Sequence, residues 1–390
     1  MFTNKDLAKC RADTPGCHQV VHFNNAGSAL PTNSVLNAQI NYLKEEAMIG
    51  GYEAHAKHHE TIEATYSSVA NLLNAQSHEI ALMENATQAW NAAFQAISFQ
   101  EGDEIIVNQC DYASNYLACL HHLKAPKIRV IPNTTQGDMD MNALKAAISD
   151  KTRLIAITHM PTNGGVLAPA EEIGAIAKEH HVLYLLDACQ TAGQYPLDVE
   201  QLQCDMLSAT GRKYLRGPRG TGFLYVRQSR WPELIPYTID LHSATWTGEN
   251  TYTIRQDARK FETWESNKAN VLGLKAAVDY ARNIGLESIW ERVQYLSQNL
   301  RAELSTINGV EVHDQGTHLG GIVSFTKAGL SAEKVQQGLR KNQIHVSWSG
   351  IPNTYLDMTR RGLKEIVRAS VHYYNSDKEI GQFIKALKEL

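Results

Sequence analysis

The segment from Ser208 to Gly222 carries the strongest chemical signal in the chain. It reads SATGRKYLRGPRGTG, so that Thr210, Arg212 and Lys213 stand before a run rich in glycine. Hydroxyl, guanidinium and backbone N–H groups of this kind hold phosphate. A cation beside a lysine lowers its pKa and frees the amine for Schiff-base chemistry, which makes Lys213 a candidate nucleophile. The structural alternative is a basic surface turn before a strand, because glycine patterns alone are weak signals.

A second signal is Asp187, the last residue of the apolar run Val182–Asp187 (VLYLLD). Ligands of open α/β sheets bind outside the carboxyl ends of such strands. A poorly solvated carboxylate there needs a cationic partner, and a protonated pyridine nitrogen or an arginine would serve. Gln190, three residues later, can donate to the same ligand. The alternative is an aspartate that caps a helix.

Two further positions suggest anion binding. Thr87, in Glu84-Asn-Ala-Thr87, opens a helical pattern, and helix N-termini bind anions, although an ordinary N-cap explains the pattern equally. Arg368 lies inside an apolar strand pattern and needs a carboxylate, from a substrate or from the protein, to offset its desolvation.

His55, His58 and His59 have helical spacing but no accompanying acid or cysteine set, so we expect a solvated face and no metal.

Composition excludes several classes of protein. The 390 residues include 37 basic and 41 acidic side chains, and a net charge of −4 argues against nucleic-acid binding. No apolar run approaches the roughly 20 residues of a membrane span. Six cysteines without a CxxC pair, and a polar N-terminus from Met1 to Cys17, predict a reduced, cytoplasmic protein without structural zinc.

The elements that must position these residues alternate along the chain. Continuous apolar runs indicate strands buried on both faces, hence an open parallel α/β sheet. We expect strands at 104–108, 127–132, 153–159, 182–187, 205–209 and 222–226, with helices at 87–97 and 169–179. Beyond residue 260 we expect helices at 270–286, 289–307, 331–341 and 377–390 and strands at 320–325, 344–347 and 367–371. The predicted division is a large α/β domain with an N-terminal arm (1–265) and a small α+β domain (266–390).

In this order the motifs resemble those of the class V pyridoxal-phosphate aminotransferases and cysteine desulfurases, of fold type I, over about residues 20–385. The resemblance implies a mostly parallel seven-stranded sheet, pyridoxal 5'-phosphate as cofactor, and a homodimer in which a phosphate contact crosses between subunits. It implies that Lys213 carries the cofactor as an internal aldimine, that Asp187 pairs with the pyridinium nitrogen and that Gln190 approaches the phenolic oxygen. The residues implied around the phosphate are Ala86, Thr87, Thr210 and Arg212, with Arg212 where many members have His.

The resemblance assigns further residues. Tyr112 matches the aromatic residue that stacks on the ring, and Thr162 falls near the phenolic oxygen, with Asn163 as its rival. Arg368 matches the group that binds the substrate α-carboxylate. Pocket-lining candidates for the substrate are Asn25 and Tyr52, followed by His55, Trp348 and Arg361. The Gly-Thr-Pro that usually makes the crossing phosphate contact is replaced by Trp264-Glu-Ser-Asn267.

One departure bears on the reaction. Desulfurases carry a nucleophilic cysteine in a loop shortly before the carboxylate-binding arginine, whereas Val346–Tyr355 holds no cysteine here and the last one in the chain is Cys204. Persulfide chemistry through that loop is therefore not available. With Asn24–Ser28, Gly51-Tyr52 and Ala209-Thr-Gly-Arg-Lys213, the chain is similar to a subgroup that includes ergothioneine-pathway C–S lyases and isopenicillin-epimerase-like proteins.

The implied chemistry acts on a small amino acid. The substrate amine displaces Lys213 to form an external aldimine, and the freed amine acts as general base at Cα. We expect β-elimination from a cysteine-type substrate, a C–S lyase reaction, with transamination and epimerisation as alternatives. A catalytically silent, cofactor-binding regulator is a further alternative. A nucleotide-binding protein is disfavoured because no GKS/T P-loop and no early GxGxxG occurs.

Overall fold

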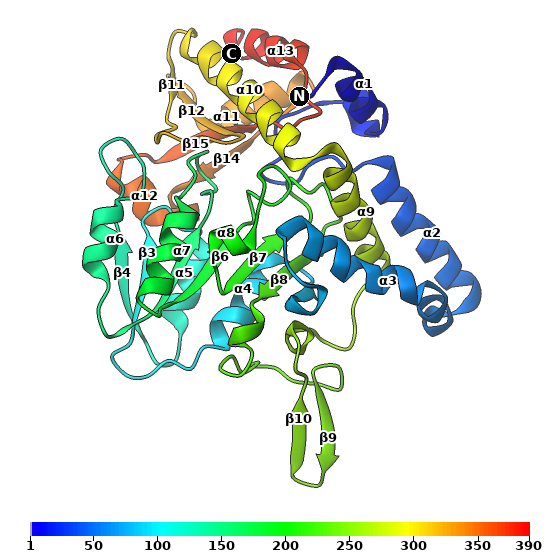
Figure 1. The fold of residues 1–390 in the computed structure, drawn as a ribbon. Coiled ribbons are helices and arrows are strands. Elements are labelled where there is room, and N and C mark those ends of the chain that lie inside the picture. The colour runs from blue at the N-terminus through cyan, green and yellow to red at the C-terminus, as the bar shows by residue number, and fades with distance from the viewer. Residues whose placement is uncertain (1) are drawn as a thin grey trace.

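A mostly parallel sheet of seven strands forms the centre of the computed structural model, which describes residues 2–390 (Figure 1). In spatial order the strands are β2 (Ile80–Met83), β8 (Gly222–Val226), β7 (Met206–Thr210), β6 (Leu183–Asp187), β5 (Thr152–Thr158), β3 (Glu104–Asn108) and β4 (Lys127–Ile131). β8 runs antiparallel to both of its neighbours, β2 and β7, and the other neighbouring pairs are parallel. The predicted fold class is confirmed; β2 was not among the predicted strands.

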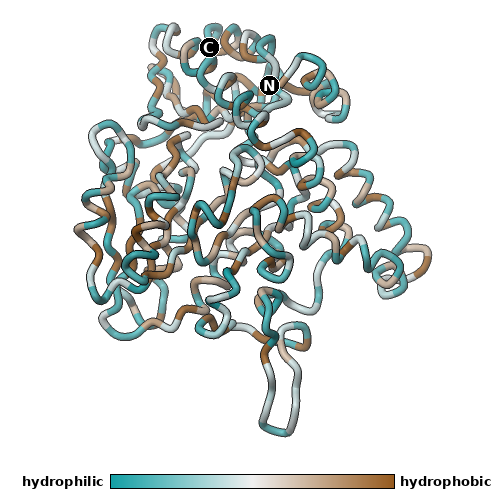
Figure 2. The backbone as a smooth tube through the Cα atoms, in the orientation of Figure 1, coloured by the Kyte–Doolittle hydropathy of each residue, from teal (hydrophilic) through white to brown (hydrophobic). Residues whose placement is uncertain are grey.

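Helices cover both faces of this sheet because its strands are apolar on both sides. Leu185 of β6 packs in one buried cluster with Phe94 of α4 (Ala86–Gln95), while its neighbour Leu186 packs in the other with Ile173 of α7 (Ala170–Glu179). Figure 2 shows apolar residues along the central strands, with polar residues frequent on the outer helices. The remaining helices of this part are α3 (Gly51–Leu73), α5 (Ala113–His121), α6 (Met141–Ala147) and α8 (Val199–Leu202).

A second, antiparallel sheet forms the C-terminal part. Its strands are, in spatial order, β11 (Val310–Val312), β12 (Ile322–Lys327), β15 (Glu365–Ser370) and β14 (Ser347–Gly350). The helices of this part are α10 (Leu286–Ser305), α11 (Ala332–Lys341), α12 (Tyr355–Arg360) and α13 (Asp377–Lys388). The strand predicted at 344–347 is divided, because β13 (Ile344–His345) pairs with β1 (Val21–His22) near the N-terminus whereas β14 pairs with β15.

The N-terminal segment touches both parts of the molecule. Helix α1 (Asn4–Ala12) lies beside the C-terminal part, while α2 (Asn33–Ile49) packs with α3 and α9 (Lys268–Ile284), and α3 contacts β2 of the large sheet (Figure 1). The domain boundary at residue 265 stays a prediction. The packing of α9 favours a junction near Gly285, where a φ of 93° separates α9 from α10.

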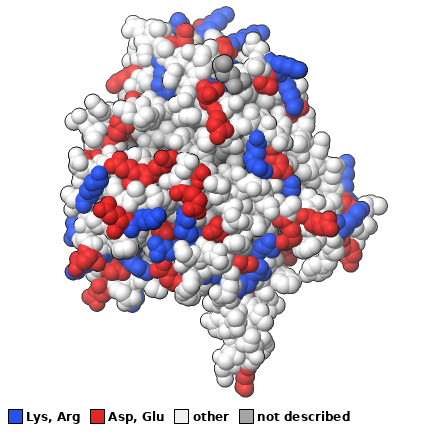
Figure 3. All heavy atoms as spheres, viewed as in Figure 1, with Lys and Arg blue, Asp and Glu red and all other residues white. Residues whose placement is uncertain are grey.

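The other elements are short. The hairpin of β9 (Ala244–Gly248) and β10 (Thr251–Ile254) projects away from the body (Figure 1), and the side of it seen in Figure 3 is largely uncharged except at the tip. Five 3₁₀ turns span Pro15–His18, Ser77–Glu79, Gln228–Arg230, Ala258–Phe261 and Ile351–Asn353. Within residues 2–390, no helix combines the length and the apolar character that crossing a membrane demands.

Candidate active site

A cavity of about 240 Å³ lies at the carboxyl ends of β3, β5, β6 and β7. Parallel pairing places Thr158, Asp187 and Ser208 in one row near this edge; β5 ends at Thr158, β6 at Asp187 and β7 two residues later, at Thr210. Every predicted cofactor-binding residue lines the cavity: Ala86, Thr87, Tyr112, Thr162, Asp187, Gln190, Thr210, Arg212 and Lys213. Residues more than 120 positions apart in sequence therefore share one site.

Asp187 is a buried acid without a basic partner. Its Oδ2 accepts a hydrogen bond from Asn115 Nδ2 of α5 at 2.8 Å, and its Oδ1 accepts one from the backbone N–H of Cys189 at 2.9 Å. No Lys, Arg or His among the residues that the structure describes forms an ion pair with it. Two neutral donors leave room for a cation, and a pyridinium N–H fits this requirement.

Lys213 sits in a tight loop after β7. The backbone N–H of Gly217 donates to Gly211 O at 2.7 Å and that of Arg216 donates to Lys213 O at 2.9 Å, so the loop is closed around the lysine. The lysine amine has no hydrogen-bond partner within residues 2–390. Burial lowers the pKa of Lys213, and the neighbouring Arg212 cation lowers it further, which favours the nucleophilic amine.

The anion end of the cavity is the start of α4. Asn85 caps this helix by accepting from the backbone N–H of Gln88 at 2.9 Å, which leaves the first N–H groups of the helix free for an anion. Gly222 lets the start of β8 lie close to the start of α4, because a Cβ at Gly222 would be only 2.8 Å from the backbone of Asn85. Arg212, half-buried beside it, donates to Gly27 O and adds positive charge.

One buried polar atom of Gln190 has no hydrogen-bond partner within residues 2–390. Its Nε2 donates to Ala26 O at 3.2 Å, while its buried Oε1 has no partner in the described chain. Buried polar atoms are nearly always paired, so this orphan points to a group absent from the protein itself. Together with the free acid, the free amine and the anion site, it fits pyridoxal 5'-phosphate.

Arg368 reaches the wall of this cavity through Thr162. On β15, its Nη1 donates to the backbone oxygen and the hydroxyl of Thr162, and its Nε and Nη2 donate to Ser347 Oγ at 3.2 and 3.0 Å. Burial lowers the pKa of Arg368 to about 10, and no carboxylate in the part of the chain that the structure covers pairs with it. A buried guanidinium held only by neutral acceptors is suited to a ligand carboxylate.

Thr162 and Tyr112 both line the cavity, whereas Asn163 does not. Tyr112 precedes α5, 37% exposed, and its backbone N–H donates to Thr158 Oγ1 at 3.2 Å. Asn163 is turned away from the cavity, because its Nδ2 donates to Thr354 Oγ1 at 2.7 Å. Of the two rivals, Thr162 is the one that lines the site.

Two predicted substrate residues are not brought to this cavity. Asn25 is fully buried, and its Nδ2 donates to the backbone oxygens of His22 and Ser370 while its Oδ1 accepts from Tyr374. Tyr52 is 76% exposed on α3 and borders a separate, larger cavity of about 1170 Å³.

The remaining lining candidates also lie elsewhere. His55 borders the larger cavity, Trp348 is not among the residues around Lys213, and Arg361 pairs with Asp357 at 3.2 Å. Of the three histidines at helical spacing, His58 contacts Glu45 Oε2 at 2.5 Å.

Sequence reasoning missed three groups at the site. Cys189 lines the cavity between Asp187 and Gln190, and Asn115 orients Asp187. Asp111 is buried, accepts from the backbone N–H groups of Thr158 and Asn108, and burial raises its pKa to about 7. The sequence could have pointed to Asn115 through its position about one helical turn after Tyr112.

The fold and this site define a pyridoxal-phosphate-dependent enzyme of fold type I. The chain belongs to the aminotransferase class-V family, whose family model matches residues 20–383. Both the family and the cofactor predicted from the sequence are thereby confirmed, while the likeness to ergothioneine-pathway lyases stays a prediction.

Similar proteins include two probable cysteine desulfurases. That of Methanothermobacter thermautotrophicus is 29% identical, covering 97% of each chain, and that of Synechocystis sp. is 28% identical, covering 95% of this chain and 91% of the relative. The apo cysteine desulfurase from Thermococcus onnurineus NA1 superimposes with a TM-score of 0.92 at 26% identity, covering 100% of this chain and 98% of that one. The cystine C–S lyase C-DES, in complex with cysteine persulfide, shares the fold with a TM-score of 0.86 at 24% identity, covering 97% and 99%.

Proposed function

We propose that this enzyme is a C–S lyase that performs β-elimination on a cysteine-type amino acid. The observation that carries the proposal is the segment Val346–Tyr355, which has no cysteine and in which Ser347 instead holds Arg368. A segment with no thiol cannot receive sulfur as a desulfurase loop does. The relatives named as cysteine desulfurases, and the neighbour named as a cystine lyase, support a sulfur-containing amino acid as substrate.

The roles of the residues follow from their positions. Bound pyridoxal phosphate supplies an electron sink for negative charge at the substrate Cα. Asp187 would hold the positive charge of the ring nitrogen, and the α4 N-terminus with Arg212 would hold the phosphate. Arg368 binds the substrate carboxylate. Lys213 Nζ removes the Cα proton, after which the Cβ–S bond breaks and the sulfur leaves with its electron pair.

The test is a product assay with purified holoenzyme. Cysteine, cystine and cysteine sulfoxide conjugates are supplied separately, and pyruvate and ammonia are measured, with Lys213→Ala as the inactive control. The expected result is pyruvate and ammonia in equal amounts from at least one substrate. Amino exchange that depends on an added keto acid, without pyruvate, identifies an aminotransferase. Racemised substrate identifies an epimerase, and no turnover at all a silent regulator.

We further propose that the enzyme is a homodimer that buries the surface around the larger cavity. Large apolar side chains are exposed there, on the α2–α3 junction and near α9: Leu43, Met48, Ile49, Tyr52, Tyr237 and Trp264. A second copy is the occupant that the family resemblance implies. Sedimentation analysis of Leu43→Glu/Met48→Glu is expected to show monomers, with Leu123→Glu, on the loop after α5, as the matched control. A monomeric parent protein contradicts the proposal.

A reducing, cytoplasmic location is part of the same proposal. All six cysteines are free within the described residues, which suits a compartment that keeps thiols reduced. A fractionation of cells that express the native chain tests it.

A further inference from the structure

Arg216 is the most deeply buried cation in the neighbourhood of Lys213. Its side chain is 1% exposed, and among residues 2–390 no acid forms an ion pair with it. An unpaired buried charge is unfavourable unless hydrogen bonds and aromatic faces replace its hydration. Its presence three residues after the lysine therefore needs an explanation.

The guanidinium is held in a neutral cage. Nε donates to Leu30 O at 2.8 Å, Nη1 donates to Tyr373 OH at 2.7 Å, and Nη2 donates to Thr14 Oγ1. The ring of Tyr374 lies 4.4 Å from the guanidinium carbon and that of Tyr373 lies 5.2 Å away. The cage thus comes from the N-terminal segment and from the chain that follows β15.

The backbone of Arg216 closes the turn that begins at Lys213. Its N–H donates to Lys213 O at 2.9 Å, and its φ of 64° lies in the left-handed region, which is uncommon for non-glycine residues. Gly217, a residue type that takes this conformation without strain, stands one residue later. The anchor and the strained backbone belong to one residue.

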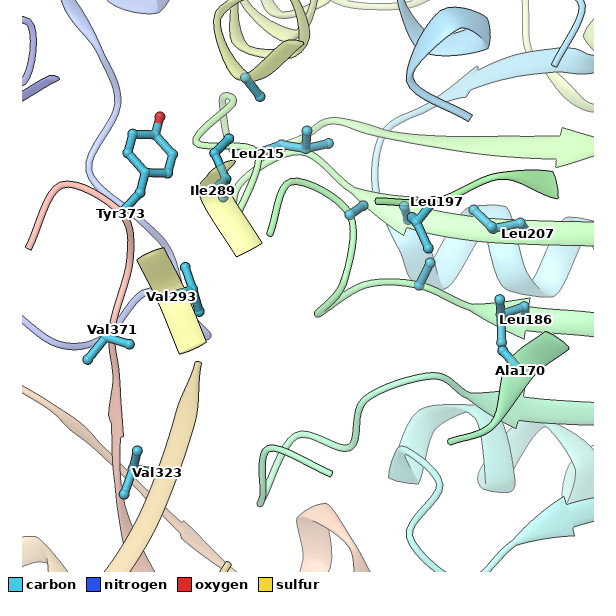
Figure 4. Close-up of a cluster of buried hydrophobic side chains, with 14 of the residues drawn as sticks. Ala170, Leu186, Leu197, Leu207, Leu215, Ile289, Val293, Val323, Val371 and Tyr373 are labelled. Atoms are coloured by element: carbon cyan, nitrogen blue, oxygen red, sulfur yellow. The ribbon is translucent and has the colours of Figure 1, made fainter. Parts of the chain in front are cut away.

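The same chain segment also carries the carboxylate-binding group. Arg368 lies on β15, and the residues just after that strand supply Tyr373 to the cage and His372, whose Nε2 contacts Tyr214 O at 2.9 Å. Figure 4 shows Leu215 and Tyr373 in one buried cluster with Ile289 of α10. Side-chain contacts on both sides of the Lys213 turn thereby connect the loop that carries Lys213 with β15, the strand that carries Arg368.

We propose that Arg216 is a positioning residue for Lys213, fixing the lysine loop relative to the strand that carries Arg368. The proposal rests on the proposed function, in which those two side chains act on one substrate. Arg216 itself touches neither the cavity nor its ligands. Small displacements of a reacting group lower rates by as much as a hundredfold, so such an anchor matters to the reaction.

The test follows the Lys213 amine directly. In cofactor-free protein, Lys213 is reductively methylated with formaldehyde across a pH series, and the peptide is quantified by mass spectrometry. The parent protein is expected to show a midpoint below that of an ordinary lysine, because burial lowers the pKa of Lys213. In Arg216→Met the midpoint is expected to rise toward the ordinary value as the amine loses its fixed buried position. Capture of pyridoxal phosphate at Lys213 is expected to slow at least tenfold.

Matched variants separate positioning from general destabilisation. Arg292→Met removes another largely buried arginine, which contacts Asn375 O and Asp377 of the same C-terminal segment but nothing in the lysine loop, and it is expected to behave as the parent does. Tyr373→Phe keeps Arg216 and deletes one partner, and a smaller change in the same direction is expected. If Arg216→Met does not fold, Tyr373→Phe is the variant that tests the positioning role of Arg216.

An unchanged methylation midpoint and capture rate in a folded Arg216→Met, or in Tyr373→Phe where the former fails to fold, overturns the proposal, whatever happens to the melting temperature. The methylation profile needs no cofactor, so it remains decisive for Arg216 even if the parent protein captures no pyridoxal phosphate. A parent protein that captures no pyridoxal phosphate contradicts the proposed function instead.

Discussion

The guanidinium of Arg368 donates two hydrogen bonds to Thr162, to its backbone oxygen at 2.7 Å and to its hydroxyl at 2.6 Å. Arg368 belongs to the C-terminal sheet, whereas Thr162 follows β5 of the large sheet and lines the cavity around Lys213. The arginine that we propose binds the substrate carboxylate is therefore fixed to the wall of the cavity around Lys213 by a contact between the two parts of the molecule.

Ser347→Ala is expected to raise KM for the amino acid about fivefold while kcat changes little. Ser347 Oγ accepts from both Nε and Nη2 of Arg368, and a hydrogen bond to a charged group contributes about 1.5–3 kcal/mol, part of which the substrate or water replaces. Steady-state kinetics on whichever cysteine-type substrate the product assay identifies provides the measurement. Ser349→Ala on the same strand, whose hydroxyl accepts from Asn353 instead, is the control. An equal rise in KM in both variants would falsify the specific role.

Asp187→Asn is expected to lower kcat by roughly a hundredfold or more, the scale of losing one preorganised charge at a reacting centre. Asn115→Ala is expected to cost about tenfold, because its amide only orients the Asp187 carboxylate, with a Nδ2–Oδ2 distance of 2.8 Å. Single-turnover assays with saturating cofactor measure both effects.

Asn142→Ala, at an exposed position of α6, is the control for the asparagine deletion and is expected to match the parent. A larger loss from Asn115→Ala than from Asp187→Asn contradicts the assignment of Asp187 as the group that acts on the ring nitrogen.

Cys189 is expected to be alkylated slowly, and only when the cofactor is absent. Burial raises the pKa of its thiol well above the ordinary value, and the Asp187 carboxylate raises it further, so the reactive thiolate is scarce at neutral pH. Because Cys189 lines the cavity, bound cofactor shields it. Iodoacetamide labelling from pH 7 to 9.5, followed by peptide mass spectrometry, gives the rate, which should climb throughout the range.

The other five cysteines are buried and serve as internal references in the same digest. Equal labelling of Cys189 with and without pyridoxal phosphate is the outcome that contradicts its placement.

Acid is expected to cost stability through His159. Burial lowers the pKa of His159 to about 4, so the folded protein keeps the ring neutral while the unfolded chain takes up a proton below about pH 6.5. A depressed pKa contributes stability above the unfolded value, and that contribution is lost as pH falls from about 6.5 to 4. The advantage of the parent over His159→Gln in urea-unfolding free energy should therefore shrink across this window.

The comparison is made as a difference between two proteins because Asp111 acts in the opposite sense. Burial raises the pKa of Asp111 to about 7, so its contribution falls as pH rises from about 4 to 7, and it cancels between the parent and the variant. A parent-to-variant difference that stays constant from pH 7 to 4 contradicts a neutral, buried His159.

The central sheet and most of the residues that line the cavity around Lys213 were predictable from the sequence alone. Apolar runs long enough to be buried on both faces predict parallel strands, and Asp187 and Lys213 stand at or just beyond strand ends, where topology requires a ligand edge. These features are local, since they depend on spacing within one strand and its following loop. The helix at 87–97 was predicted for the same reason, and its stripe of Ala89, Trp90, Ala93 and Phe94 is buried.

Which groups converge from distant segments became apparent only in the folded chain. Asn25 looks like a site residue in the sequence, yet the chain after β15 encloses it, and no spacing rule reveals a contact across about 345 residues. The cage around Arg216 escaped prediction for the same physical reason, because its hydrogen bonds and rings come from segments that meet only in the folded chain. Cys189 and Asn115 lie close in sequence to predicted residues, but Asn115 of α5 meets Asp187 of β6 only through packing within the large domain.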